Sequence, residues 1–231
     1  MKKSIKKITE FYGKKIAEFA LKMGAIKLSI DKPFTWASGY KMPIYNDNRM
    51  FLSKSEYRKI ISDAFVQMIE ELGLKIDNIA GCATAGIPHA TTLADRLALP
   101  LSYVRSSAKD HGMANQIEGL VNNSYEGKEV LLIEDLISTG GSSISAVNAV
   151  RNAHGNCTNC FAIFTYGFSK STDAFLSLKP KCNLYTILDY DTMIQTALDI
   201  GYIDEKSKES LIEWRTSPFT WQDRFINKEN Q

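Results

Sequence analysis

The spacing of apolar residues predicts two helices in the first third of the chain. Apolar side chains recur three or four positions apart over residues 5–23, which is the period of one helix face. The same spacing returns over residues 53–72, and Gly73 follows as a stop signal. Between the two helices, residues 34–51 hold short β-prone pieces broken by glycine and proline. We expect strands and turns there, outside the main sheet.

Beyond residue 75, short apolar strands alternate with helical segments. Strands are expected at residues 76–80, 101–104, 130–133, 161–165 and 183–187. One helix is expected from about residue 142 to 154, with Gly155 as its C-terminal stop. This alternation predicts an α/β fold with a parallel sheet covered by helices on both faces. Ligands of such sheets bind outside the carboxyl ends of the strands.

Length and composition limit the possible classes of protein. The 231 residues allow one large domain with an appendage, which we divide into a helix and hood segment (1–52), an α/β core (53–205) and a C-terminal extension (206–231). A net charge of +2 argues against nucleic-acid or basic membrane-surface binding. No apolar run reaches the roughly 18 residues of a membrane helix, and the basic N-terminus lacks the apolar stretch of a signal peptide. A cytoplasmic location is expected.

Four cysteines, at positions 82, 157, 160 and 182, are too few and too scattered for a disulfide framework. The sequence Cys157-Thr-Asn-Cys160, with His154 just before it, is compatible with a zinc or redox site. A structural role is favoured instead, because no second ligand pair lies nearby and the segment reads as a strand. Residues three apart on a strand point to opposite faces.

The stretch 130-VLLIEDLISTGGSSI-144 combines an apolar strand, two adjacent acids and a small flexible loop. A glycine-containing loop at a helix start favours phosphate, because its backbone N–H groups are unpaired. Glu134 and Asp135 would repel that phosphate, and they suit sugar hydroxyls or Mg²⁺ instead. Ribose 5-phosphate satisfies both halves. The alternative is a plain helix cap after an exposed acidic pair, and the lysine of a nucleotide P-loop is absent.

An apolar strand, an acid-Asp pair, two apolar residues and S-T-G-G-S resemble the phosphoribosyl pyrophosphate (PRPP) signature of the type I phosphoribosyltransferases. Members of that family transfer ribose 5-phosphate from PRPP to a nitrogen nucleophile with Mg²⁺ as cofactor. The resemblance assigns no direct protein ligand to the metal. It implies that PRPP is bound by Glu134, Asp135, Leu136, Ile137, Ser138, Thr139, Gly140, Gly141 and Ser142.

The segment 105-RSSAKDHGMANQIEG-119 reads as a mobile cationic loop, which we name the lid. Such a loop could neutralise a departing pyrophosphate and exclude water, or it could be an ordinary solvated loop. R-x-x-x-K-x-H-G followed by Q-I-E-G resembles the catalytic loop of orotate phosphoribosyltransferases. The resemblance implies a homodimer whose lid reaches into the neighbouring site. Arg105, Lys109 and His111 would then bind PRPP and, with Asp135, serve in catalysis.

Two further segments resemble the same family. The segment 34-FTWASGYKMPIYNDNR-49 is similar to its N-terminal hood, in which Lys41, Tyr45 and Arg49 are candidates for holding an anionic planar acceptor. Arginine suits a carboxylate through its two-pronged geometry, so Arg49 and Ser138 are assigned to orotate. These hood residues could equally be surface or packing residues. The segment 81-GCATAGIPHA-90 resembles the pyrophosphate loop, which would offer backbone amides through its glycines.

The resemblance covers residues 15–200 and has departures. Some members carry lysine where Ala37 stands and a Tyr-Lys pair where Thr84 and Ala85 stand. Others carry a basic residue at Ser106 or an arginine near Tyr166. The implied reaction joins orotate to PRPP and gives orotidine 5′-monophosphate and pyrophosphate. Two rivals remain: a phosphoribosyltransferase with another base as acceptor, and a non-catalytic PRPP-binding regulator.

Overall fold

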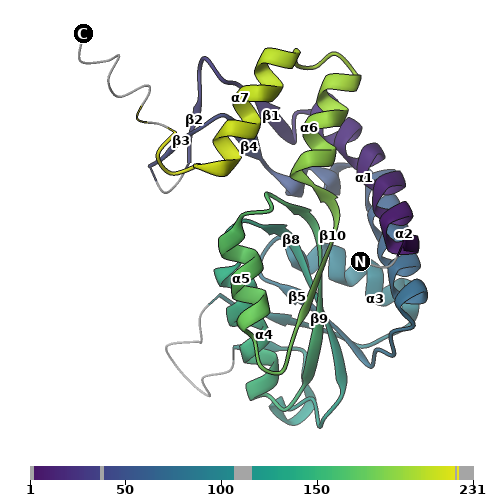
Figure 1. Cartoon of the computed structure of the whole chain (residues 1–231). Helices are drawn as coiled ribbons and strands as arrows, with labels where there is room; N and C mark the ends of the chain where they lie inside the picture. The colour runs from purple at the N-terminus through teal and green to yellow at the C-terminus, as the bar shows by residue number, and fades with distance from the viewer. Residues whose placement is uncertain (1–2, 37–38, 107–115, 222, 224–231) are drawn as a thin grey trace.

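The computed structural model describes residues 3–36, 39–106, 116–221 and 223 (Figure 1). Its α-helices are α1 (Lys3–Met23), α2 (Ser55–Leu72), α3 (Gly86–Leu97), α4 (Gly141–Asn152), α5 (Ser169–Ser177), α6 (Tyr190–Asp199) and α7 (Glu205–Thr216). Two short 3-10 helices are η1 (Asn48–Ser53) and η2 (Val121–Asn123). The predicted helices near the N-terminus are confirmed, and Gly73 ends α2 in the left-handed conformation.

The strands of the described residues are β1 (Ile26–Leu28), β2 (Phe34–Thr35), β3 (Lys41–Met42), β4 (Ile44–Asn46), β5 (Asn78–Cys82), β6 (Leu101–Val104), β7 (Ile117–Glu118), β8 (Glu129–Ile137), β9 (Asn156–Thr165) and β10 (Asn183–Asp189). Six of them form the central sheet in the order β10-β9-β8-β5-β6-β7. All neighbours in it are parallel except β6 and β7. The predicted α/β fold with a mostly parallel sheet is confirmed.

Helices cover both faces of the sheet, with α4 and α5 on one side and α1, α2 and α3 on the other (Figure 1). Strand β8 shows how the sequence divides its side chains between two cores. Leu131 and Ile133 belong to the cluster beneath α1, α2 and α3, whereas Val130 and Leu132 belong to the cluster beneath α4. This alternation follows from the two-residue period of a strand. Continuous apolar runs are therefore needed to bury both faces.

Strand β8 is longer than expected. The sequence predicted its end at residue 133, but pairing with β9 continues through Glu134, Leu136 and Ile137. The two acids therefore lie within the strand rather than after it. Polar side chains are tolerated at this end of β8 because neighbouring elements supply hydrogen-bond partners there. The carboxyl end of a parallel strand is also where ligands of such sheets bind.

The predicted end of the following helix was also wrong. Helix α4 ends at Asn152, and His154 rather than Gly155 takes the left-handed conformation, with φ of 61°. Gly155 is required for a different reason. A Cβ there would lie 2.8 Å from side-chain atoms of Tyr125 and Val150, so this glycine permits close packing against a buried tyrosine.

The cysteine prediction is confirmed in one part and wrong in another. Cys157 and Cys160 lie on β9 as expected and are buried, free thiols. They do not point to opposite faces, because both belong to the cluster beneath α4. A bulge explains this: Glu129 pairs with Asn156 and Leu131 with Asn159, so β9 contains one extra residue that resets the alternation.

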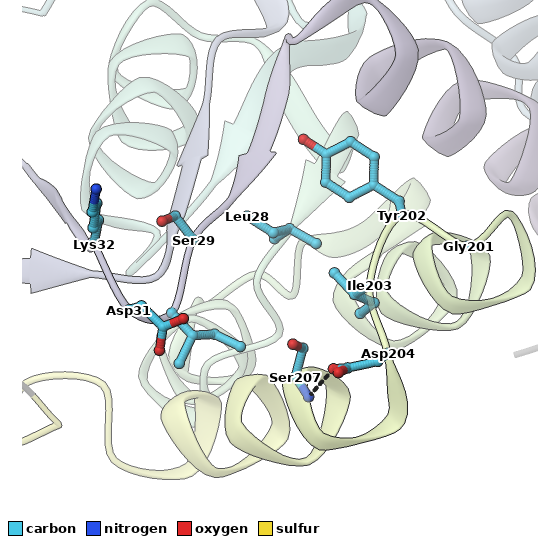
Figure 2. A pocket seen from close by; sticks show the side chains of 10 residues that line it. Leu28, Ser29, Asp31, Lys32, Gly201, Tyr202, Ile203, Asp204 and Ser207 are labelled. Atoms are coloured by element: carbon cyan, nitrogen blue, oxygen red, sulfur yellow. Dashed lines mark hydrogen bonds between the residues drawn. The ribbon is translucent and has the colours of Figure 1, made fainter.

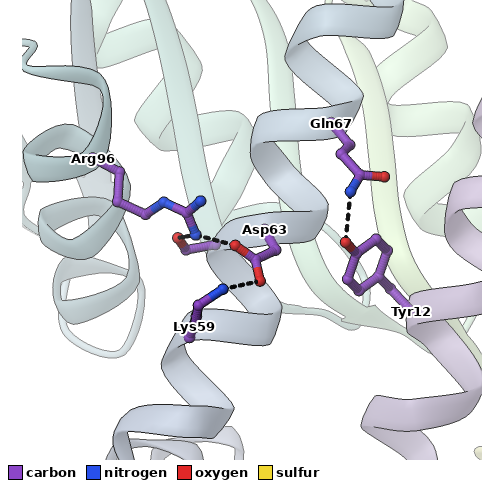
Figure 3. Close-up of polar contacts among 6 residues, drawn as sticks. Tyr12, Lys59, Asp63, Gln67 and Arg96 are labelled. Carbon is purple, nitrogen blue, oxygen red and sulfur yellow. Dashed lines mark hydrogen bonds and ion pairs between the residues drawn. The ribbon is translucent and has the colours of Figure 1, made fainter.

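Polar contacts join α1, α2 and α3 at their exposed edges (Figure 3). The carboxylate of Asp63 on α2 accepts from Lys59 at 2.8 Å and from Arg96 on α3. Burial raises the pKa of Asp63, but these two cations outweigh it and leave that pKa below its ordinary value of 3.8. Gln67 donates to the hydroxyl of Tyr12 on α1 at 2.7 Å. These bonds fix the helices that cover one face of the sheet.

The hood region, residues 26–53, packs at one end of the sheet as two small two-stranded pairs, β1 with β4 and β2 with β3. Helix α7 lies beside these strands (Figure 1). Its Trp214 is fully buried and its Nε1 donates to Met42 Sδ at 3.1 Å. The C-terminal extension thus packs as a helix up to residue 216. The three-part division of the chain stays a prediction, since α1 shares a core with β10 and α6. Among the described residues, no helix is long and apolar enough to cross a bilayer.

Candidate functional site

A cavity of about 510 Å³ lies between the hood and the loop that follows β8. Its walls come from four separate parts of the chain. The residues that line it are Thr35, Trp36, Tyr45, Asn46, Leu136, Ser138, Thr139, Tyr166 and Phe219. Three of the predicted PRPP residues, Leu136, Ser138 and Thr139, therefore face the same space as the predicted hood residue Tyr45. The sequence predicted the hood and the loop separately, and the fold brings them together.

The loop at the start of α4 has the geometry of an anion site. Gly140 has φ of 84°, a conformation that only glycine adopts readily, and it precedes the first helical residue, Gly141. No side chain caps this helix start, and Ser142 is exposed beside it. The first N–H groups of the helix are thus available to a phosphate, with the helix dipole in support. Ile137 is buried, so only its backbone can take part in binding.

The two acids of β8 differ in their surroundings. Glu134 is 6% exposed, and its carboxyl accepts from Ser143 Oγ and from the backbone N–H of Asp135, both at 3.1 Å. Burial, followed by the charge of Asp135, raises the pKa of Glu134 from 4.5 to about 8. Burial raises the pKa of Asp135 too. Burial and the neighbouring charge thus favour the protonated form of Glu134, which reduces the repulsion between two adjacent acids near an anion site.

Asn48 in η1 connects the hood to the end of β8. Its side chain is buried and its Nδ2 donates to the backbone carbonyl of Asp135 at 2.7 Å. The hood is thereby fixed at the position of the acidic pair. Asn48 and Ser143 each lie inside a motif quoted above, but nothing in the sequence pattern marks either as part of the site. A buried asparagine next to a strand-end acid is visible only once the fold places them together.

Arg49 does not line the cavity. Its guanidinium forms a two-pronged ion pair with Asp47, with Nε 2.6 Å from Oδ1 and an Nη2 contact of 2.9 Å to Oδ2. This hydrogen-bonded pair raises the pKa of Arg49 and lowers that of Asp47. The predicted role of Arg49 toward an acceptor carboxylate would require the guanidinium to leave Asp47 or to be shared with it.

The lid is described only at its two ends. Arg105 N–H donates to the carbonyl of Gln116 at 2.8 Å, and the amide of Gln116 donates back to the carbonyl of Arg105 at 3.0 Å. Arg105 also lies 3.5 Å from the carboxylate of Glu118. These contacts close the base of the loop. Lys109 and His111 lie outside the described residues.

The glycines of the predicted pyrophosphate loop have a packing explanation. A Cβ at Gly81 would lie 2.9 Å from the Cα of Ile87, and one at Gly86 would lie 2.6 Å from the carbonyl oxygen of Ile133. Both glycines therefore allow α3 to approach β5 and β8 closely. The peptide bond between Ala83 and Thr84 in the same turn is cis.

Aromatic residues form the wall of the cavity opposite the loop after β8. Tyr166, at the position where some family members carry arginine, is 2% exposed and stacks on Phe168 with centroids 5.3 Å apart. Trp36 packs 5.4 Å from Tyr166. Trp36 and Tyr45 lie in the quoted hood segment, whereas Phe219, which also lines the cavity, lies beyond the motifs that carry the resemblance. The cavity is thus shaped for a planar, partly apolar ligand.

A second cavity, of about 590 Å³, lies between residues 28–32 and residues 201–207 (Figure 2). It shares no lining residue with the first. Asp204 accepts from the backbone N–H of Ser207 at 2.8 Å and so caps α7. None of the predicted site residues lines this second cavity.

Taken together, the parallel sheet, the acidic strand end, the glycine loop at a helix start and the overlying hood define a type I phosphoribosyltransferase. The family model for the phosphoribosyl transferase domain matches residues 50–192. An orotate phosphoribosyltransferase of Oceanobacillus iheyensis is 50% identical over 204 residues, which is 88% of this chain and 98% of that protein. The chain belongs to the orotate phosphoribosyltransferase family.

Solved structures agree with the fold. The crystal structure of orotate phosphoribosyltransferase from Aeropyrum pernix has a TM-score of 0.68 at 23% identity and covers 82% of this chain and 99% of that one. The orotate phosphoribosyltransferase of Mycobacterium tuberculosis in complex with PRPP has a TM-score of 0.59 at 19% identity, covering 79% of this chain and 98% of that one.

Proposed function

We propose that this protein transfers ribose 5-phosphate from PRPP to orotate and forms orotidine 5′-monophosphate and pyrophosphate, a step towards UMP. The observation that carries the proposal is the cavity of about 510 Å³ whose walls are shared by the loop after β8 and by the hood. A donor held on the loop and an acceptor held under the hood would meet inside it. The 50% identical relative from Oceanobacillus iheyensis bears the same activity in its name.

In this proposal PRPP lies along the end of β8. The 5′-phosphate sits at the start of α4, on the backbone of residues 138–142, where the helix N-terminus favours an anion. Asp135 accepts hydrogen bonds from the ribose hydroxyls. Glu134 would fix the backbone at Asp135, because its carboxyl accepts hydrogen bonds from Ser143 and from the N–H of Asp135. Leu136 and Ile137 contribute backbone to the same site.

Orotate is a suitable acceptor for such a site. Its ring nitrogen is nucleophilic as the anion, so the chain needs no strong base, and the barrier lies in breaking the anomeric C–O bond. Positive charge then develops on the ribose, close to Asp135. Positioning and electrostatic stabilisation would supply most of the rate.

The cavity offers orotate both stacking surface and polar contacts. Trp36 and Tyr45 provide aromatic surface for a planar ring, and the buried Tyr166 packs against Trp36. The side-chain amide of Asn46, which also lines the cavity, has no hydrogen-bond partner in the described structure. An unpaired buried amide is costly, about 1–3 kcal/mol, and a base with ring N–H and carbonyl groups would pair with it. Ser138 is the assigned contact on the donor side, and Arg49 is the assigned partner of the carboxylate.

The lid completes the proposed site. Lys109, His111 and Arg105 would surround the departing pyrophosphate, with Lys109 as the main source of positive charge and His111 as a lid contact or proton donor. The lid of one subunit would serve the site of its partner in a homodimer. Support comes from the motif itself and from the closed base of the loop at Arg105 and Gln116.

The residues present fit Mg²⁺ bound mainly through substrate oxygens. No group of three or more His, Cys, Asp or Glu side chains in the described residues could hold a metal alone. Asp135 offers one carboxylate beside the ribose position, and Mg²⁺ is commonly held by one or two carboxylates with phosphates of the substrate. When bound, the ion would supply neutralisation of pyrophosphate charge.

A cytoplasmic location is part of the proposal. All four cysteines are free and buried, which suits a reducing compartment. Neither nucleic acid nor a membrane is expected as a partner, given the net charge of +2.

Incubation of the protein with PRPP, Mg²⁺ and one acceptor at a time separates the proposal from its rivals. Orotate should yield its nucleoside monophosphate by chromatography, whereas uracil, adenine and hypoxanthine should yield none. A nucleotide product from one of the other bases alone would support the rival acceptor. Absence of any product from folded protein that binds PRPP would support the regulator.

A further inference from the structure

The C-terminal extension is anchored to both the hood and the core. Trp214 of α7 is fully buried, with its ring 6.3 Å from Trp36 and 5.8 Å from Tyr166 between centroids. The hydroxyl of Tyr190 donates to the carbonyl of Leu211 at 3.0 Å. Helix α7 is therefore fixed relative to Trp36 and Tyr166, which line the cavity of about 510 Å³ (the acceptor cavity).

Past the end of α7 the chain turns and places Phe219 at that cavity. The ring of Phe219 lies 5.2 Å from Tyr40 and 6.3 Å from Phe168 between centroids. Two residues further on, Trp221 is 4% exposed and closes the turn against the core. In the sequence Phe219 lies between two buried tryptophans, Trp214 and Trp221, yet 42% of its own surface stays exposed. An aromatic ring that is held in place but uncovered at a cavity is suited to contact a ligand.

We propose that Phe219 is a wall of the acceptor site and contacts the planar ring of the acceptor base. This inference rests on the proposed function. The side of the cavity formed by Ser138 and Thr139 belongs to the donor, and Phe219 stands with Trp36 and Tyr166 among its aromatic residues. The acceptor ring lies between these two sides, and its entry covers the exposed surface of Phe219.

The position of Phe219 in the chain gives this contact a consequence for specificity. The phosphoribosyl transferase domain matches residues 50–192, so Phe219 lies outside the matched domain. The matched domain supplies the donor site. Apart from Tyr166, the aromatic side of the cavity comes from the hood and the C-terminal extension, which lie on either side of that domain in the sequence. Phe219 should therefore affect affinity for the base and leave affinity for PRPP unchanged.

The test compares Phe219→Ala with Ile212→Ala. Ile212 is a matched control, because it is 40% exposed on α7 and does not line the cavity. Phe219→Ala should raise the KM for orotate about tenfold, the size expected for loss of one aromatic contact. The KM for PRPP and kcat should stay within about twofold. Phe219→Tyr should keep the KM for orotate near the wild-type value, and Ile212→Ala should change neither KM.

Equilibrium binding gives a second readout. Binding of orotidine 5′-monophosphate can be measured by the quenching of tryptophan fluorescence, since Trp36 lines the cavity. Its affinity should weaken by a similar factor in Phe219→Ala and stay unchanged in Ile212→Ala. An unchanged KM for orotate in folded Phe219→Ala would overturn the inference, and so would an equal rise of both KM values, which a purely structural role predicts. If Phe219→Ala failed to fold, Phe219→Leu would be measured in the same way. If the wild type used a base other than orotate, the proposed function would fail, and the KM for that base would still test Phe219.

Discussion

At the residue scale, neighbouring acids are made compatible by unequal environments. Glu134 lies on the side of β8 that faces α4, where Ser143 donates to it, and burial raises its pKa to about 8. Asp135 is more exposed and receives a contact from the hood through its carbonyl. In the proposed site, one acid would thus support the backbone while the other would accept from the ribose hydroxyls. Their adjacency in the sequence gave no sign of this division.

A second buried titratable group, His89 on α3, gives a prediction about pH. His89 is 2% exposed, its Nε2 has no partner in the described structure, and burial lowers its pKa from 6.5 to about 4, with Arg58 as a smaller cause. Above pH 6.5 the residue is neutral in both states. Below pH 6.5, His89 binds a proton in the unfolded chain but not in the folded protein. The free energy of unfolding therefore falls by up to about 3 kcal/mol between pH 6.5 and 4.

Urea denaturation of wild type and His89→Gln across this range measures the effect. The difference in unfolding free energy between the two should shrink or reverse as the pH falls, because the variant lacks the titrating group. His154→Asn is the control, since His154 is exposed. Parallel pH profiles for wild type and His89→Gln would show that His89 titrates normally.

At the scale of elements, close packing of α3 on the sheet depends on glycine. Gly86 begins α3, and a Cβ there would press on the backbone carbonyl of Ile133, which cannot turn aside as a side chain could. Gly141 begins α4 in the same way, but a Cβ at that position would meet nothing within 4 Å. Both helices thus start with glycine, but only Gly86 lacks room for a side chain.

Gly86→Ala should therefore destabilise the protein by about 1–3 kcal/mol through overpacking. Gly141→Ala should leave stability unchanged or raise it by about 0.4–1 kcal/mol, because alanine restricts the unfolded chain. Urea midpoints of the two variants, compared with wild type, check this. Equal stability of both variants would mean that α3 can move away from β8 at little cost.

Sequence patterns predicted the helices and sheet strands well because burial on both faces demands continuous apolar runs. They failed where polar residues continue a strand, as at Glu134 and Asp135, and where a bulge resets the alternation, as before Cys160. The donor loop was recognisable because all its residues are consecutive. The acceptor cavity was not, because Asn46, Tyr166 and Phe219 are far apart in the sequence and meet only in the fold.

At the scale of the whole molecule, the proposed lid makes two subunits dependent on each other. Each proposed site combines Asp135 of one subunit with the lid of the other. Lys109→Ala should lower kcat much more than it weakens PRPP binding. Asp135→Asn should inactivate the site in its own subunit. Mixing the two variants under subunit exchange should restore up to about a quarter of wild-type activity, because half of the dimers then contain one intact site. Steady-state rates of the mixture check this.

The double variant Lys109→Ala/Asp135→Asn provides the control for that mixture. Combined with Lys109→Ala, it can form no intact site and should recover nothing. If the first mixture also stayed inactive although mixed dimers were demonstrated by mass, each subunit would be using its own lid.

The most direct test of the whole account is the ultraviolet absorption band of orotate during turnover. With PRPP and Mg²⁺ present, the band should decline as orotidine 5′-monophosphate forms, and added pyrophosphate should restore it. Asp135→Asn should slow the decline strongly. A band that stays unchanged over folded wild-type protein, with PRPP and Mg²⁺ both supplied, would contradict the account.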